Sequence, residues 1–330
     1  MQQSSDQVLV TTVWSYYENM LFTRCMASMA AAADVTEPED LMKIAQQAAS
    51  AGAQVVLEAL DKPRLIKLKG ALDLVTETDV ASEKAVLEVL KRHCPHHAVL
   101  GEEGGVSGDP SSGYLWCVDP LDGTTNFAHQ YPAFAVSVGV MKGLTPVAGC
   151  VVEFAGGPGT WVTRTYTASL GGGAMLNGRT IKTSSVTDIE QSLLVTGFGY
   201  DHGAAWALNM EFFKYFTDKA RGVRRLGAAS VDLCHVACGM AESYWEYLLK
   251  PWDTCAGVII LTEAGGKVTT LDGQLYSPFH RSLLASNGGM HARVLEVTAC
   301  RTKTLSVECG VDLSPWLIPD GYDAFGLKSY

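Results

Sequence analysis

One segment constrains this chain more than any other, an apolar strand that runs into a rigid acidic turn. Tyr114–Val118 is a run of large apolar residues and predicts a buried strand. It continues into Asp119-Pro120-Leu121-Asp122-Gly123-Thr124-Thr125-Asn126. The proline restricts the backbone between the two aspartates, so the turn can direct both carboxylates and the Leu121 carbonyl to one point. Hard divalent cations prefer such oxygen ligands, and magnesium also takes substrate phosphate.

The residues after this turn add an anion site. Gly123-Thr124-Thr125 has the pattern of a first helical turn, whose backbone N–H groups favour phosphate. Metal ligands beside a phosphate site are the layout of phosphoryl transfer to water. Asp-Pro and Asp-Gly are also ordinary turn chemistry, so this segment alone leaves a purely structural role open.

Further acids follow other predicted strand ends. They lie in Asp73–Asp79 and in Gly101-Glu102-Glu103-Gly104, and Asp253 is expected as the N-cap of a helix over Thr254–Ala264. Carboxylates that gather at one point repel one another unless cations are bound. The combination therefore favours a magnesium site.

Composition narrows the remaining classes. A length of 330 residues predicts two domains or one large one. The formal net charge of −10 argues against a nucleic-acid partner. The chain has no apolar run long enough for a membrane span and no charge pattern of a secretory signal. The 9 cysteines form no Cys-x-x-Cys motif and are expected as buried thiols.

The pattern along the chain predicts its organisation. We expect a tail over residues 1–35 that is either a targeting remnant or a plain tail, an α+β metal-binding domain over 36–190, an α/β domain over 191–298 and a surface tail over 299–330. Thr36 and Glu39 have capping-box spacing and predict a helix start. Asn177-Gly178 predicts a hairpin turn.

Three motifs resemble the inositol monophosphatase family: Gly101-Glu102-Glu103, Trp116–Phe127 and Trp252–Gly266. The resemblance runs from about Met42 to Leu295. Three further stretches are similar to the plastid-type inositol-monophosphatase-like proteins of plants and algae: Leu193–Tyr200, Arg221–Ala229 and Glu242–Tyr247. The resemblance implies a layered αβαβα sandwich of the inositol monophosphatase and fructose-bisphosphatase type.

The resemblance also implies the roles of single residues. One Mg²⁺ would be held by Glu102, Asp119 and the Leu121 carbonyl, and a second by Asp119, Asp122 and Asp253; a third, weaker ion would use Glu102 and waters. Asp79 and Thr124 would orient and deprotonate the attacking water. The remaining implied roles are phosphate binding by the backbone of Gly123 and Thr124, cyclitol contact by Ala229 and Glu246, and support of the ligands by Glu103.

The expected function is hydrolysis of myo-inositol monophosphates by a magnesium-dependent phosphomonoesterase. The resemblance implies lithium inhibition, a homodimer, and a chloroplast location or otherwise a cytoplasmic one. The same chemistry on L-galactose 1-phosphate, histidinol phosphate, fructose 1,6-bisphosphate or a 3′-phosphonucleotide stays open.

Two other classes are disfavoured. A haloacid-dehalogenase-type phosphatase needs Asp-x-Asp, whereas the spacing here is Asp-x-x-Asp. A non-catalytic metal-binding scaffold would have no need of the Asp79 and Thr124 pair. Glu246 could instead be a surface acid at a strand edge. A basic cluster could attract an anionic substrate or a second phosphate, or form a solvated face or dimer contact; its members are Lys219, Arg221, Arg224 and Arg225.

Overall fold

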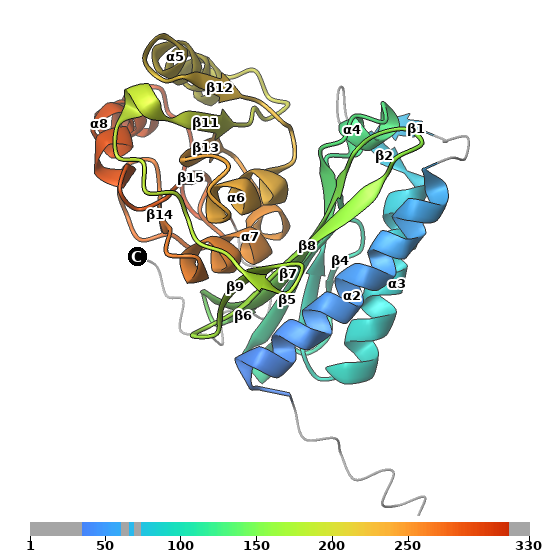
Figure 1. Ribbon diagram of the computed structural model, residues 1–330. Helices are drawn as coiled ribbons and strands as arrows, with labels where there is room; N and C mark the ends of the chain where they lie inside the picture. Colours follow the sequence, from blue (N-terminus) through green and yellow to red (C-terminus); the bar gives the residue numbers. More distant parts are fainter. Residues whose placement is uncertain (1–34, 61–65, 69–73, 317–330) are drawn as a thin grey trace, which may run out of the picture. The chain divides into compact units, whose positions relative to one another are not determined.

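The computed structural model describes residues 35–60, 66–68 and 74–316 (Figure 1). Its contacts divide the chain into Met1–Val35 and one compact unit, Thr36–Tyr330, and the fold described below is that of the second unit. Apart from Val35, the expected N-terminal tail lies outside the described residues, as does Asp73 of the first acidic segment. The division into two domains at residue 190 stays a prediction.

The helices of the described residues all belong to the second unit. They are α2 (Pro38–Ala59), α3 (Glu77–His93), α4 (Thr124–Ala128), α5 (Ala204–Lys219), α6 (Ala229–Ala237), α7 (Pro251–Glu263) and α8 (His291–Glu308), with short 3₁₀ turns at Pro110–Ser112 and Ile189–Gln191. No helix within the described ranges is long and apolar enough to cross a bilayer.

Eight described strands form the larger sheet, in the order β10-β9-β8-β7-β6-β5-β3-β4. Their bounds are β3 (Ala98–Gly101), β4 (Gly105–Ser107), β5 (Tyr114–Asp122), β6 (Phe134–Lys142), β7 (Thr145–Ala155), β8 (Val162–Ser169), β9 (Gly173–Leu176) and β10 (Arg179–Thr180). Only β3 and β5 pair in parallel within this sheet, as far as the described residues show. Asn177 and Gly178, both with positive φ, turn the chain from β9 to β10 and confirm the expected hairpin.

The smaller sheet has the order β12-β11-β13-β15-β14 among the described residues. Its strands are β11 (Leu193–Thr196), β12 (Gly222–Arg224), β13 (Ser243–Tyr247), β14 (Lys267–Thr269) and β15 (Ser282–Ser286). A separate antiparallel pair joins β1 (Ile66–Leu68) to β2 (Leu74–Thr76). Strand β13 is central in the smaller sheet, so Glu246 on this strand lies between two neighbouring strands.

Helices and sheets alternate in layers (Figure 1). Helices α2 and α3 contact one face of the larger sheet and α7 contacts the other. Gly52 of α2 packs on Val136, and α7 packs on Gly139. Both contacted residues belong to β6 and are three positions apart, so they point to opposite faces of the sheet. In the smaller sheet, Tyr244 packs in a core with residues of α6 and α7, whereas Trp245 packs with residues of α5 and α8. The expected layered αβαβα sandwich is thus confirmed.

Several element ends differ from expectation. Helix α2 begins at Pro38 after Glu37, without a side-chain cap, so the capping box predicted at Thr36 is wrong. Strand β5 continues through the acidic turn to Asp122 instead of ending at Val118. The predicted tail beginning at residue 299 starts inside a helix, because α8 extends to Glu308 and buries Thr302 and Leu305.

Two cross-strand glycines allow α7 to approach the larger sheet closely. Gly139 of β6 pairs with Gly149 of β7. A Cβ at Gly139 would lie 2.6 Å from the Ala256 backbone nitrogen, and one at Gly149 would lie 2.8 Å from the Ala256 Cα. Backbone atoms in the middle of a helix cannot move aside cheaply, so glycine is required at both positions.

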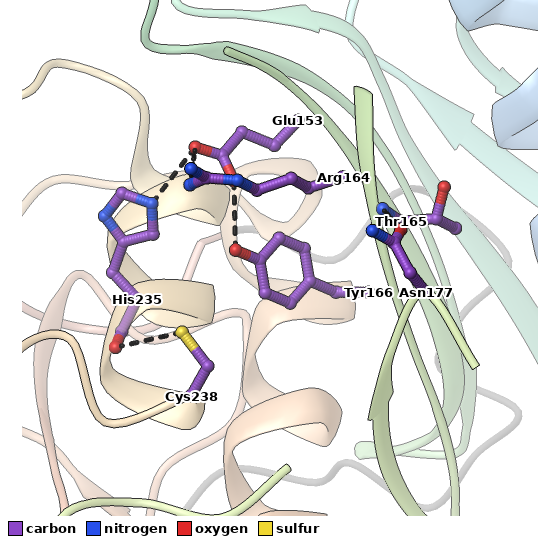
Figure 2. Close-up of polar contacts among 7 residues, drawn as sticks. All are labelled: Glu153, Arg164, Thr165, Tyr166, Asn177, His235 and Cys238. Carbon is purple, nitrogen blue, oxygen red and sulfur yellow. Dashed lines mark hydrogen bonds and ion pairs between the residues drawn. The ribbon is translucent and has the colours of Figure 1, made fainter. Parts of the chain in front are cut away.

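A buried polar network joins α6 to the larger sheet (Figure 2). Glu153 of β7, only 2% exposed, lies 3.1 Å from His235 Nε2 of α6 and accepts a 3.0 Å hydrogen bond from the Tyr166 hydroxyl of β8. Arg164 is 3.5 Å away. Burial alone raises the pKa of Glu153, but the hydrogen bond and charge of His235, with Arg164 and Tyr166, outweigh it and leave that pKa below its ordinary value.

Replacing Gly139 by alanine tests the close approach of α7. We expect Gly139→Ala to lower the free energy of unfolding by about 1–3 kcal/mol, because its methyl group meets the α7 backbone. Urea unfolding measures this. Gly199→Ala is the matched control, since a Cβ there meets no atom within 4 Å. Equal stability of the two variants would contradict the packing.

Removing the charge of Glu153 tests the buried network. Glu153→Gln leaves Arg164 without its counter-charge and His235 without its carboxylate partner, and we expect a loss of about 1–3 kcal/mol in the free energy of unfolding at neutral pH. Asp218→Asn, which breaks the exposed Lys214–Asp218 pair, is the control and should change little.

The pH dependence of the same variant has a defined sign. A folded pKa below the unfolded one stabilises the fold above the unfolded pKa, and this stabilisation is lost as the pH falls through the folded pKa. The difference between the wild type and Glu153→Gln should therefore shrink when urea unfolding is repeated below about pH 4. A difference that stays constant down to low pH would contradict the ionised state of Glu153.

Candidate functional site

Two parallel strands deliver the first acids to one edge of the larger sheet. Strands β3 and β5 pair so that Gly101 lies opposite Val118, and the Glu102 N–H donates to the Val118 carbonyl at 3.1 Å. Glu102 and Asp119 therefore leave neighbouring strands at the same level. This arrangement follows from strand register, with no contribution from the acids themselves.

A β-bulge shapes the acidic turn. The pairing of β5 with β6 shifts between Asp119 and Asp122. Asp119 Oδ1 accepts the Leu121 N–H at 3.0 Å, and the Pro120 carbonyl accepts the Ser82 hydroxyl at 2.8 Å. Asp119 and Asp122 are only 2% and 8% exposed. The bulge thus fixes two buried carboxylates next to each other on a rigid strand.

The N-terminus of α6 holds Asp122. The carboxylate accepts the Ser230 N–H at 2.8 Å, the Ser230 hydroxyl at 2.6 Å and the Ala229 N–H at 3.2 Å. Burial raises the pKa of Asp122, while these donors act in the opposite direction. Ala229, which the resemblance places against the substrate, thus binds the Asp122 carboxylate through its backbone N–H.

The structure brings Asp79 and Thr124 together. Thr124 Oγ1 lies 3.1 Å from Asp79 Oδ1 and 3.1 Å from the Leu121 carbonyl. Asp79 Oδ2 accepts the N–H and hydroxyl of Thr76 at 2.9 and 2.5 Å, which forms a capping box at the start of α3. Burial raises the pKa of Asp79, against the hydrogen bonds of Thr76 and Thr124. A hydroxyl has one proton, so Thr124 donates to one acceptor at a time.

Asp253 lies at the third position of α7. The expected N-cap role is wrong, because the helix begins at Pro251 and its N-cap is Lys250. Proline favours the first helical position. The Asp253 carboxylate accepts the Lys250 N–H at 2.6 Å. It is therefore still at the positive end of the helix, three positions further in than the sequence predicted.

These acids act on one another electrostatically. Burial raises the pKa of Asp119 well above its ordinary value, and the charges of Glu102, Asp122 and Asp253 raise it further. The pKa of Asp253 is raised by burial and by Asp122 and Glu102. Four of the expected ligands thus share one low-dielectric region in which their mutual repulsion is strong.

The donor set fits a hard divalent cation, although its oxygens do not converge as ligands. Carboxylates with an adjacent carbonyl are the chemistry that magnesium and calcium prefer. Among the described residues, however, no group of three Asp, Glu, His or Cys side chains has a geometry that could hold a metal ion. Asp119, Asp122 and Asp253 each accept hydrogen bonds from backbone donors instead. The ligand set therefore stays a prediction.

Glu246 is buried and lies on a central strand. It is 8% exposed on β13, which has β11 and β15 as neighbours, so the alternative of a surface acid at a strand edge is wrong. The Tyr244 hydroxyl donates to its Oε2. Burial raises the pKa of Glu246 to about 7. Gly197 packs against the Glu246 carboxylate, and a Cβ at position 197 would clash with that carboxylate.

The basic cluster is exposed throughout: Lys219, Arg221, Arg224 and Arg225 all lie at the surface. The charge of Arg225 nevertheless reaches Glu246 and Asp232, where it opposes the rise in the pKa of both. Arg225 also donates to the Phe198 carbonyl at 3.4 Å.

The loop that carries Glu102 rests on an acid that the sequence analysis missed. The backbone N–H of Glu103 donates to Glu83 of α3 at 2.9 Å, and Gly101 and Gly104 pack against the Glu83 carboxylate. Glu83 is only 4% exposed. An acid on the inner face of a helix, next to a Gly-Glu-Glu-Gly loop in space, has no spacing signal in the sequence.

Ser230 and Asp232 were missed as well. Ser230 donates to Asp122 as described above. Asp232 is a fully buried carboxyl that makes no hydrogen bond to any described residue, and its pKa is raised by burial and by the charges of Glu246 and Asp122. Two polar residues in the first turn of the largely apolar helix Ala229–Ala237 are the signal that could have indicated them.

Comparisons with known proteins agree with this geometry. The sequence pattern described as the Inositol monophosphatase family matches residues 37–303. The chain is 58% identical over 285 residues to "Phosphatase IMPL1, chloroplastic" of Arabidopsis thaliana, covering 86% of this chain and 76% of the relative. It is 40% identical over 269 residues to the "Inositol-1-monophosphatase" of Synechocystis, covering 80% and 92%.

A solved structure shows the same fold. The inositol monophosphatase of Anabaena (Nostoc) superposes with a TM-score of 0.69 at 39% identity, covering 80% of this chain and 96% of the other. Sequence and fold lead to one assignment: this chain belongs to the inositol monophosphatase family and is a phosphatase of that family.

Proposed function

We propose that the chain is a magnesium-dependent phosphomonoesterase that hydrolyses myo-inositol monophosphates to myo-inositol and phosphate. One observation carries the proposal. Thr124 Oγ1 lies 3.1 Å from the buried Asp79 carboxylate, in a turn that also carries Asp119 and Asp122. A hydroxyl paired with a carboxylate beside an acidic cluster can orient a water molecule toward a phosphate group.

The acidic residues would hold two or three magnesium ions. Glu102, Asp119 and the Leu121 carbonyl would bind one, and Asp119, Asp122 and Asp253 a second, with Glu102 and waters holding a third. When bound, magnesium neutralises the carboxylates and the substrate phosphate and lowers the pKa of the attacking water. The mutual repulsion of the acids on Asp119 supports this assignment.

Asp79 and Thr124 would position the water. Thr124 donates its proton to Asp79 Oδ1, which leaves the threonine oxygen free to accept a hydrogen bond from the water. Thr76 holds the other Asp79 oxygen and so fixes the carboxylate. Glu102 would help to hold the surrounding waters, and Glu103 would support Glu102 through its backbone bond to Glu83.

Substrate would lie between the acidic turn and β13. The backbone N–H groups of Gly123 and Thr124 would bind the phosphate, while Ala229 and Glu246 would contact the cyclitol. The buried Glu246 carboxylate, already bound by Tyr244 on one oxygen, can accept hydroxyl hydrogens on the other. This geometry favours a polyol over an apolar alcohol.

Location and assembly belong to the same proposal. The similar Arabidopsis protein is described as chloroplastic, and we propose a chloroplast location for this chain. A homodimer and lithium sensitivity stay predictions of the family resemblance.

Replacing the Thr124 hydroxyl tests the water-positioning pair. We expect Thr124→Val, which keeps the shape and removes the hydroxyl, to lower kcat by at least about 10²-fold. Thr124→Ser keeps the hydroxyl and should recover most of that loss. Phosphate release from myo-inositol 1-phosphate with Mg²⁺ measures both. A Thr124→Val variant that turns over normally would eliminate the proposed role.

Removing the charge of Glu246 tests the substrate class. We expect Glu246→Gln to raise KM for myo-inositol 1-phosphate about tenfold, since a charged acceptor for hydroxyl groups is lost. p-Nitrophenyl phosphate, which has no sugar hydroxyls, is the matched control, and its KM should be unchanged in the variant.

The same phosphate-release assay, run on the wild type with the alternative esters named above, ranks these substrates. A wild-type preference for one of these esters would overturn the inositol assignment.

A further inference from the structure

A C-terminal segment beyond the family match contacts the turn that leads to Asp253. The family pattern ends at residue 303, whereas Trp316 lies thirteen residues later in the chain. The Trp316 indole N–H donates to the Leu249 carbonyl at 2.6 Å, and its backbone N–H donates to the Phe279 carbonyl at 2.8 Å. Trp316 thus joins two separate loops, one through its side chain and one through its backbone.

Two cations lie over the same ring. Lys250 Nζ is 3.2 Å and Arg281 Cζ is 4.0 Å from the Trp316 ring centroid. Arg281 also pairs with Asp312 at 3.5 Å, so a second residue of the same segment holds this arrangement. Indole is the aromatic ring that binds cations most strongly. These contacts define a C-terminal brace, formed by Asp312 and Trp316.

The contacted turn is under backbone strain. Leu248 has a φ of 66°, in the left-handed region that a leucine rarely adopts. Such a conformation persists only where neighbouring contacts hold it. The Leu248 N–H donates to the Arg281 carbonyl at 2.6 Å, and Trp316 binds the next residue, Leu249.

The turn connects two residues of the site. It follows Glu246 on β13 and ends at Lys250, whose backbone N–H donates to the Asp253 carboxylate at 2.6 Å. Any shift of Lys250 therefore moves the donor that orients Asp253. Trp252, next to Asp253, packs in the same apolar cluster as Trp316.

We propose that Trp316 is a positioning residue that holds the Leu248–Lys250 turn and thereby fixes Asp253 for magnesium binding. The inference rests on the proposed function, because it takes Asp253 as a metal ligand. Within the described part of the chain, the polar and cation–π contacts of Trp316 are with residues outside the expected substrate and metal groups, so it acts through Leu249 and Lys250.

Calorimetric titration with Mg²⁺ on the full chain tests this role. We expect Trp316→Ala to weaken Mg²⁺ binding about tenfold, because substituting residues that orient metal ligands commonly lowers metal affinity by about this much. Activity should recover at saturating Mg²⁺, and the amides of Leu249 and Lys250 should exchange faster with deuterium. Val307→Ala, at an 84% exposed position on α8, is the control and should bind Mg²⁺ like the wild type.

A second variant separates this inference from the proposed function. If Asp253→Asn weakens Mg²⁺ binding while Trp316→Ala binds normally, the brace is refuted and the metal site stands. If Asp253→Asn itself binds Mg²⁺ normally, the ligand assignment fails, and the brace with it.

Should Trp316→Ala not fold, Trp316→Phe provides the test, because it keeps an aromatic ring next to the two cations and loses the indole N–H donor. Unchanged Mg²⁺ affinity and amide exchange in that variant would overturn the proposal.

Discussion

The mutual repulsion of buried carboxylates is the constraint on which the site depends. Asp119 is almost completely shielded from water, and the charges of Glu102, Asp122 and Asp253 all raise its pKa. Such a group is costly to keep in a fold unless cations or hydrogen-bond donors offset the charge. The layers of the sandwich can therefore be understood as the frame that supplies donors to each acid.

Helix N-termini provide much of that support. Asp79 is the third residue of α3, Asp253 is the third residue of α7, and Asp122 accepts three hydrogen bonds from the first turn of α6. Each carboxylate thus lies where the helix dipole favours negative charge. Helix α6 is in turn fixed to the larger sheet through His235 and Glu153 (Figure 2). Helix α7 packs closely on the same sheet at Gly139. The packing of these helices on the larger sheet consequently helps to set the positions of the acids.

The local pattern predicted the strands around the acidic turn, and the family resemblance implied the layered fold and the pairing of Asp79 with Thr124. All three are present. The anchoring of Asp122 by Ser230 could not be predicted, because the two residues are 108 positions apart and no spacing rule connects them. Asp253 was misplaced within its helix because proline at the first position outweighs an aspartate as a start signal. The contacts of Trp316 were missed because residues 309–316, between the end of α8 and Trp316, form no helix or strand and carry no periodic pattern.

The central claim is that Glu102, Asp119, Asp122 and Asp253 gather around shared cations. The most direct test is a crystal structure grown with Mn²⁺, which prefers the same oxygen ligands as magnesium and scatters anomalously. We predict anomalous peaks in bonding contact with Asp119, Asp122 and the Leu121 carbonyl, with the Asp253 carboxylate completing one of the sites. A map without peaks there, in which all four carboxylates keep only their protein donors, would contradict the account.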